Sequence, residues 1–115
     1  MDIFEKAAAG QLEAYNNRDV DAFLEWYTEG VIAIDIDTDK VLYKGKDEMR
    51  KIFIEKFKNI HLKCTLKNRM VLNRSIIDHE VIKYDETNDT FEAIAIYDVD
   101  ETGLISTIRF TKGKL

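Results

Sequence analysis

The order of hydrophobic patterns along the chain limits the folds that are open to it. Helical patterns dominate the first half, with one short pair of strands between them, and four strand patterns joined by short turns fill the second half. The chain contains no proline, so its connections depend on Gly, Asn and Asp. This order is typical of an α+β domain in which helices pack on a mostly antiparallel sheet.

Three helices are predicted. The first covers residues 2–16, where apolar residues recur at steps of three and four. Asp19 is the expected N-cap of the second, whose apolar stripe runs from Val20 to Tyr27 and which Gly30 closes. The third begins after Gly45 and turns four apolar side chains inward: Met49, Ile52, Phe53 and Phe57.

The strand patterns predict a hairpin and a meander. The hairpin joins 31–37 to 41–44, and the meander runs through 62–72, 75–84, 90–99 and 104–111. Residues 93–97 are apolar on both faces, whereas an antiparallel sheet with one wet face alternates. We therefore expect the outer face of the sheet to be covered by a second copy of the chain, in a homodimer.

Composition narrows the class of protein. The 115 residues suit one domain, residues 1–115, and the 45% apolar content suits a globular one. A net charge of −5 argues against nucleic-acid binding. No apolar run reaches the roughly 18 residues of a membrane span, and the N-terminus does not have the pattern of a signal peptide. Cys64 is the single cysteine, which fits a cytoplasmic protein, and it is expected to be a core or pocket thiol rather than a nucleophile.

The chain resembles the nuclear transport factor 2-like, or SnoaL-like, superfamily, which includes ketosteroid isomerase. The resemblance covers nearly the whole chain, and its carriers are residues 12–23, 26–27, the strand ending at Asp35, 45–47, 68–72, 77–80, 95–99 and 103–105. It implies a cystatin-like cone of α+β type, with three helices from the N-terminal half on a curved sheet around a deep pocket. It also implies dimerisation through the outer face of the sheet. One fold of this kind hosts many activities.

The resemblance to ketosteroid isomerase implies a specific base. The general-base carboxylate of that enzyme falls on Asp35 of this chain. Its oxyanion tyrosine falls near Gln11, its protonated oxyanion aspartate falls near Ala95, and the proline after the base is replaced by Ile36. Loss of each oxyanion donor costs on the order of 10²–10³ in rate, so the sequence argues against the familiar steroid isomerase machinery.

Two residues are candidates for acid–base chemistry. Asp35 is either a strand-end carboxylate bonded to a turn or to solvent, or a pocket carboxylate whose pKa burial would raise. His79 is either a satisfied core histidine or a pocket acid or base. If the two face each other across the cone, they form a pair that could move a proton or activate water.

Four further residues are candidates for binding a substrate. Asn68 lies in an apolar series and needs a partner, which is either a ligand or the neighbouring strand. Tyr97 shares a face with alanines that leave room for a cavity, and it is otherwise a core residue. Tyr15 and Trp26 are expected to pack helices onto the sheet at the mouth of the pocket. Arg69 is expected at the surface, in a turn or in the dimer interface.

Three functions remain open. The first is a small enzyme in which Asp35 and His79 act on a small apolar, oxygen-bearing molecule, as an isomerase, cyclase, dehydratase or hydrolase. The second is a non-catalytic ligand-binding module, and the third is a protein-interaction domain. The sequence has no metal-ligand spacing, no glycine-rich phosphate loop and no cofactor fingerprint, so no cofactor and no metal are expected. An enzyme requires an enclosed cavity with a titratable group of shifted pKa.

Overall fold

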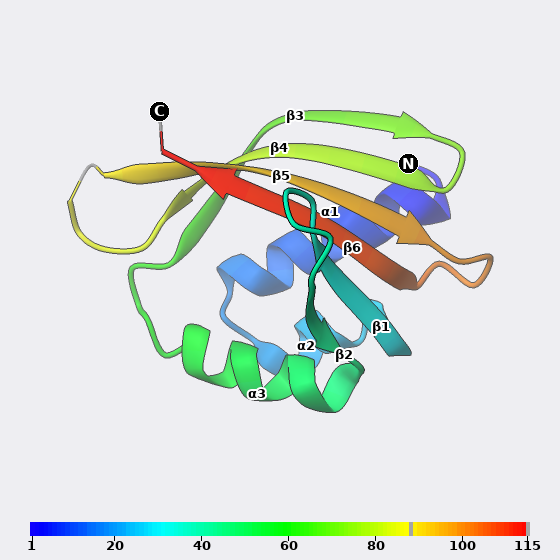
Figure 1. Ribbon diagram of the computed structural model, residues 1–115, viewed down its shortest axis with the longest axis horizontal. Coiled ribbons are helices and arrows are strands. Elements are labelled where there is room, and N and C mark those ends of the chain that lie inside the picture. The colour runs from blue at the N-terminus through cyan, green and yellow to red at the C-terminus, as the bar shows by residue number, and fades with distance from the viewer. Residues whose placement is uncertain (88, 115) are drawn as a thin grey trace.

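In residues 1–87 and 89–114, which the computed structural model describes, six strands form one curved sheet and three helices pack against one of its faces (Figure 1). The strands are β1 (Tyr27–Asp35), β2 (Val41–Lys44), β3 (Lys63–Leu72), β4 (Ser75–Lys83), β5 (Thr90–Val99) and β6 (Ile105–Gly113). The α+β class and the curved, mostly antiparallel sheet predicted from the sequence are confirmed.

The helices begin where the chain offers a cap. In α1 (Ile3–Asn16) the side chain of Asp2 accepts a hydrogen bond from the backbone of Glu5, and in α2 (Val20–Leu24) the side chain of Asp19 caps the backbone of Ala22. The third helix, α3 (Lys46–Lys56), follows Gly45, whose φ of 87° favours glycine. None of the helices within the described residues is long and apolar enough to cross a membrane.

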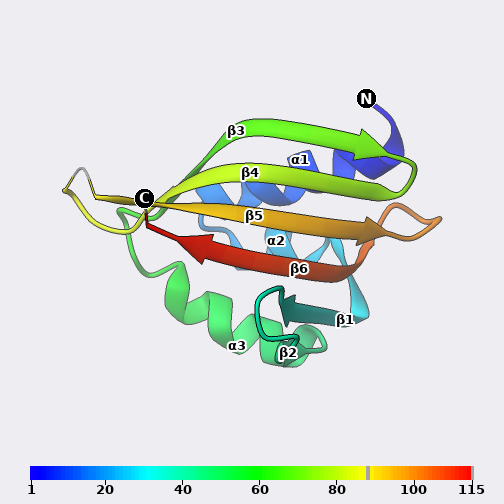
Figure 2. The ribbon, with the colours of Figure 1, turned by 45° about the horizontal axis from the view of Figure 1, so that its top comes forward.

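The order of the strands across the sheet is β2-β1-β6-β5-β4-β3, which can be followed in Figure 2. The segment β3-β4-β5-β6 is the predicted antiparallel meander. The strand β1 pairs with β6 in parallel, with Ala33 opposite Ile108. The sequence did not predict this parallel contact, which places the first strand beside the last one in the sheet.

The second helix is shorter than its apolar stripe predicted. It ends at Leu24, and Tyr27 is the first residue of β1. The backbone N–H of Ile105 donates to the carbonyl of Trp26 at 2.8 Å, so pairing with β6 prevails over the helical pattern here. Gly30 therefore lies inside a strand and does not cap a helix.

The core of the protein lies between the inner face of the sheet and the helices. The inner face and the helices enclose a core that includes Phe23, Tyr27, Met49, Ile76 and Ile105, all of them buried. On α3, Met49 and Phe53 are buried as predicted, and so is Phe57 directly after the helix, whereas Ile52 is exposed.

Candidate functional site

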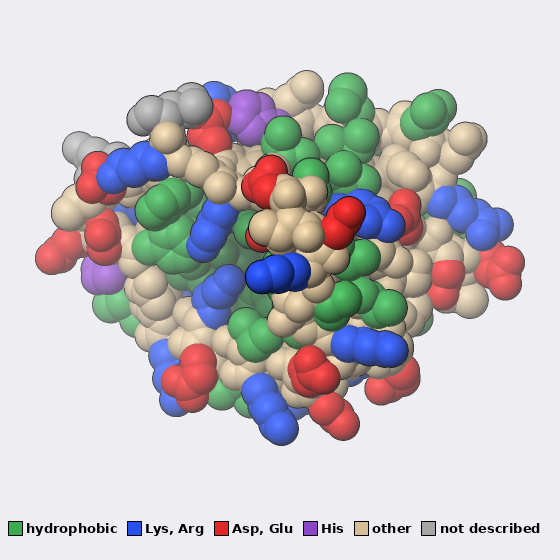
Figure 3. Space-filling model, in the orientation of Figure 1, with side chains coloured by type: hydrophobic (Ala, Val, Ile, Leu, Met, Phe, Trp, Pro, Cys, Tyr) green, Lys and Arg blue, Asp and Glu red, His purple; other side chains and the backbone are tan. Residues whose placement is uncertain are grey.

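A cavity of about 110 Å³ lies between the inner face of the sheet and the helices. Figure 3 shows hydrophobic side chains at the bottom of a hollow on the face of the molecule that this view presents, with Lys and Arg side chains on its edge. All five tyrosines of the chain line the cavity: Tyr15, Tyr27, Tyr43, Tyr84 and Tyr97. An engineered protein cavity of roughly 150 Å³ holds benzene, so this cavity has the scale of a molecule with one ring.

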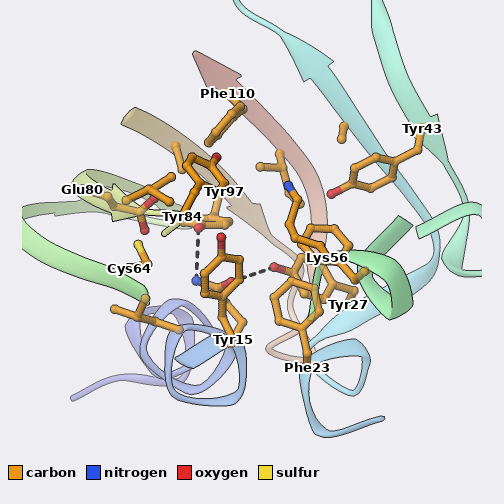
Figure 4. A pocket seen from close by; sticks show the side chains of 17 residues that line it. Tyr15, Phe23, Tyr27, Tyr43, Lys56, Cys64, Glu80, Tyr84, Tyr97 and Phe110 are labelled. Atoms are coloured by element: carbon orange, nitrogen blue, oxygen red, sulfur yellow. Dashed lines mark hydrogen bonds between the residues drawn. The ribbon is translucent and has the colours of Figure 1, made fainter. Parts of the chain in front are cut away.

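Gln11 organises the polar groups at the floor of the cavity. Its Nε2 donates to the backbone carbonyl of Ala8 at 3.0 Å and to Oη of Tyr97 at 3.1 Å, and its Oε1 accepts from Oη of Tyr27 at 2.9 Å (Figure 4). Burial raises the pKa of both tyrosines well above its ordinary value. These hydroxyls therefore remain protonated and keep fixed positions.

Glu80 is the carboxylate of the cavity. It lies on β4, and its side chain lines the cavity, although the residue as a whole is buried. Burial, with a smaller contribution from the nearby charge of Asp78, raises the pKa of Glu80 to about 7. A hydrogen bond with Cys64 and the positive charge of Arg69 act in the opposite direction. This carboxyl group can therefore accept or donate a proton near neutral pH.

Cys64 lies beside Glu80 and is a buried free thiol. Burial and the nearby Glu80 raise the pKa of this thiol. A nucleophilic cysteine needs a lowered pKa, because the thiolate is the reactive form. The structure thus favours the predicted pocket-lining thiol over a nucleophile.

Lys56 is the cation of the cavity. It comes from the last turn of α3, and its Nζ lies 5.0 Å from the centre of the Phe53 ring. Burial and the like charge of Lys112 lower the pKa of Lys56. Figure 4 shows Glu80 with Cys64 on one side of the cavity and Lys56 with Tyr43 on the other side. A small ligand between them would meet an acid–base group and an amine at opposite ends.

A buried ion pair supports the wall behind Glu80. Arg69 on β3 donates twice to Asp78 on β4, from Nε at 2.7 Å and from Nη2 at 2.9 Å. The side chain of Asp78 is 0% exposed and that of Arg69 is 10% exposed. The prediction that Arg69 is a surface, turn or interface residue was wrong, since it is the partner of a buried carboxylate.

Asp35 lies outside the cavity. Its Oδ1 accepts from the backbone N–H of Asp37 at 2.8 Å and from that of Thr38 at 3.2 Å. Asp35 is not one of the residues that line the cavity. Of the two alternatives, the structure shows the strand-end carboxylate bonded to a turn.

His79 lies on the outer face of the sheet. Its Nε2 is 2.6 Å from Oε1 of Glu92, which Lys67 also approaches at 3.5 Å. Asp35 and His79 therefore do not face each other across the cone, and the predicted acid–base pair does not form. The alternation along β4 was correct, but the face that points inward carries Asp78 and Glu80.

Asn68 is exposed, because β3 contains a bulge at Lys67. Leu66 pairs with Glu80, but Asn68 pairs with His79, so one extra residue reverses the faces of the rest of the strand. Trp26 is also outside the cavity, since its ring packs against the backbone of Gly10. Neither residue lies where a ligand in the cavity could reach it.

Tyr15 and Tyr97 line the cavity, and their role in binding a substrate stays a prediction. Sequence reasoning missed Glu80 and Lys56. A signal for Glu80 exists, because the meander register places it opposite Ala93 and places Asp78 opposite Ala95. Small residues on β5 leave room for inward carboxylates on β4. Lys56 had no such signal among the other lysines of its charged helix.

Known proteins match the chain in fold. A family model described as "SnoaL-like domain" matches residues 8–108. The chain belongs to the SnoaL-like family. It matches no curated protein sequence.

Solved structures share the fold of this SnoaL-like domain at low sequence identity. An uncharacterised cystatin-fold protein from Novosphingobium aromaticivorans is 19% identical, with a TM-score of 0.82 over 96% of this chain and 98% of the other. A proposed ketosteroid isomerase from Kribbella flavida is 12% identical, with a TM-score of 0.84 over 98% and 79%. SalBIII, an epoxide hydrolase/cyclase-like enzyme of pyran-ring formation in salinomycin, is 17% identical, with a TM-score of 0.80 over 96% and 90%.

This SnoaL-like domain combines an apolar cavity with a carboxyl group and an amine. The two positions that the resemblance to ketosteroid isomerase assigns to oxyanion donors are Gln11 and Ala95, and both line the cavity. Gln11 has an amide group, but its Nε2 already donates to Ala8 and Tyr97 and its Oε1 already accepts from Tyr27. Among the described residues that line the cavity, Lys56 is the one with a positively charged side chain.

Proposed function

We propose that this SnoaL-like domain is a small enzyme that transfers a proton on a small apolar, oxygen-bearing molecule, with Glu80 as the base. The observation that carries the proposal is the position of Glu80, a carboxyl group with a pKa of about 7 in a cavity lined by aromatic rings. A base is most effective when its pKa lies near the working pH. The family supports a role in small-molecule chemistry.

The proposed chemistry begins at a carbon next to a carbonyl group. The Glu80 carboxylate takes a proton from that carbon, and negative charge moves to the carbonyl oxygen. If the substrate has a C=C double bond beyond that carbon, Glu80 returns the proton to the far end of the conjugated system, which completes an isomerisation. If the substrate has a hydroxyl group on the neighbouring carbon, that C–O bond breaks as the new C=C bond forms, and the oxygen takes the proton from Glu80 and leaves as water, which completes a dehydration.

Deuterium exchange tests the base. Cyclohexanone in D₂O serves as the probe, and exchange at its α-carbons is followed by NMR. We expect the protein to accelerate exchange above the buffer rate, and we expect Glu80→Gln to slow the catalysed rate by about 10²–10⁴. The control is Glu13→Gln, an exposed carboxylate on α1, which should leave the rate unchanged.

Two outcomes would contradict the proposal. One is exchange at the buffer rate with the wild-type protein although a one-ring ligand binds in the cavity, which would indicate a binding module. The other is catalysed exchange that Asp35→Asn abolishes and Glu80→Gln leaves unchanged, which would indicate that Asp35 is the base.

We also propose a cytoplasmic homodimer. The outer face of the sheet carries exposed apolar side chains, among them Met70 (56%), Leu72 (74%) and Ile94 (43%). Apolar patches on a protein surface often mark an interface, and a second copy would remove these side chains from water. The free thiol of Cys64 supports a reducing compartment.

A further inference from the structure

Two lysines lie against the aromatic wall of the cavity. Nζ of Lys56 lies over the ring of Phe53 at 5.0 Å, and Nζ of Lys112 lies 3.4 Å from Oη of Tyr84 and 5.3 Å from the centre of its ring. Phe53 and Tyr84 both line the cavity. The helix α3 thus brings one ammonium group into the lining of the cavity, and the strand β6 places a second one against Tyr84, which is part of that lining.

Neither lysine has an acidic partner among residues 1–87 and 89–114. The ion pairs within 4.0 Å in that part of the chain involve other cations, such as Lys58 with Glu55 at 2.9 Å and Lys67 with Glu92 at 3.5 Å. The chain has 22 acidic residues and 17 basic ones. Although acidic residues are in excess, none of the described ones compensates the positive charge at this wall.

The charge at this wall is costly when the cavity is empty. An ammonium group that loses water without gaining a partner is destabilised, and a second ammonium nearby adds repulsion. Both effects act on Lys56, and burial and the charge of Lys112 accordingly lower its pKa. An anionic ligand group would reverse both effects, since it supplies the missing partner.

The other side of the cavity disfavours an anion. Glu80 lies there, and with a pKa of about 7 it is a neutral hydrogen-bond donor below that pH and a negative charge above it. The two sides therefore prescribe an orientation for a ligand. Its charged end belongs at Lys56 and its uncharged end belongs at Glu80.

We propose that the ligand of this cavity is a small carboxylate with one ring or an equivalent apolar body, whose carboxylate is held by Lys56, with the positive charge of Lys112 nearby. The inference rests on the proposed function only in taking this cavity as the substrate site. A carboxylate fits better than a larger anion, because the cavity of about 110 Å³ leaves little space beyond one ring. A hydrogen bond between an ammonium group and a carboxylate is stronger than a hydrogen bond between two neutral groups.

Benzoate and benzamide test the proposal, since they have nearly the same shape and differ in charge. Their dissociation constants are measured by titration calorimetry at pH 6, where Glu80 is mainly protonated. We expect benzoate to bind the wild-type protein at least about tenfold more tightly than benzamide. Lys56→Met should abolish this preference, and Lys56→Arg should retain most of it.

Lys58→Met is the matched control, because Lys58 lies two residues after the end of α3 and pairs with Glu55 on the surface. It should keep the full preference for benzoate. Melting temperatures of the Lys56 variants show whether they are folded. Equal or absent binding of the two probes to the wild-type protein, or a preference that survives in folded Lys56→Met, would overturn the proposal.

These results are separable from those on catalysis. A wild-type protein that prefers benzoate but does not exchange cyclohexanone would refute the proposed proton transfer and keep the anion site. A protein that exchanges cyclohexanone in a Glu80-dependent manner but binds benzamide as well as benzoate would refute the anion site alone.

Discussion

The raised pKa of Glu80 affects both the stability of the protein and the chemistry that this residue can perform. The folded protein holds the proton of Glu80 more tightly than the unfolded chain does, because burial raises its pKa from 4.5 to about 7. The stability that this proton contributes is fully present below about pH 4.5 and is lost as the pH rises through 7. The loss amounts to about 3 kcal/mol at most.

Glu80→Gln should therefore stabilise the protein at high pH. Glutamine has a similar shape and never carries the charge. We expect the free energy of unfolding in urea to rise by about 1–3 kcal/mol at pH 8.5 and to change little at pH 5. Equal effects at the two pH values would show that Glu80 is not the group that titrates near neutrality.

The same residue predicts the pH dependence of catalysis. The carboxylate form is the base, so the exchange rate with cyclohexanone should rise with pH and level off above about 7. The measurement is the NMR exchange rate between pH 5 and 9. A rate already at its plateau at pH 5 would exclude Glu80 as the base.

At the scale of elements, the packing of α1 on the segment before β1 depends on one glycine. A Cβ atom built on Gly10 would lie 2.2 Å from ring atoms of Trp26. Alanine is normally the better helix residue, yet here Gly10→Ala should destabilise the protein by about 1–3 kcal/mol through steric overlap. The check is urea unfolding, and a more stable variant would contradict this account of the contact.

The strands β3 and β4 are joined on the inner face by the pair of Arg69 and Asp78. Arg69→Met should lower the free energy of unfolding by about 3–5 kcal/mol, because it leaves a buried carboxylate without a partner. The control is Arg50→Met, which removes a 2.8 Å ion pair with Asp21 on the surface and should cost less than about 1 kcal/mol. Similar losses in the two variants would argue against a special role for the buried pair.

At the scale of the whole molecule, the outer face of the sheet is the surface that a second copy would cover. We expect the protein to sediment as a dimer at micromolar concentration. Ile94→Lys and Met70→Glu should shift it to the monomer, because each places a charge among apolar side chains. Ile60→Lys is the control, since Ile60 is 73% exposed but lies outside the sheet. A monomeric wild-type protein would remove the dimer proposal.

The predictions made from sequence succeeded where the pattern is local and failed where two elements had to be placed together. The apolar spacing of residues 2–16 and the turns of the second half identify α1 and the meander, since these features depend on neighbouring residues. The end of α2 was misplaced, because Tyr27 joins a strand only when β6, about 80 residues later, is there to pair with it.

The candidate site shows the same division. The sequence by itself determined an α+β cone and a strand with alternating carboxylates and apolar residues. Only the tertiary structure decided which of the two faces is the inner one. The register of β4 against β5 turns Glu80 inward and His79 outward, and the bulge at Lys67 turns Arg69 inward and Asn68 outward. An alternation of two residues defines two faces but does not say which one meets the helices.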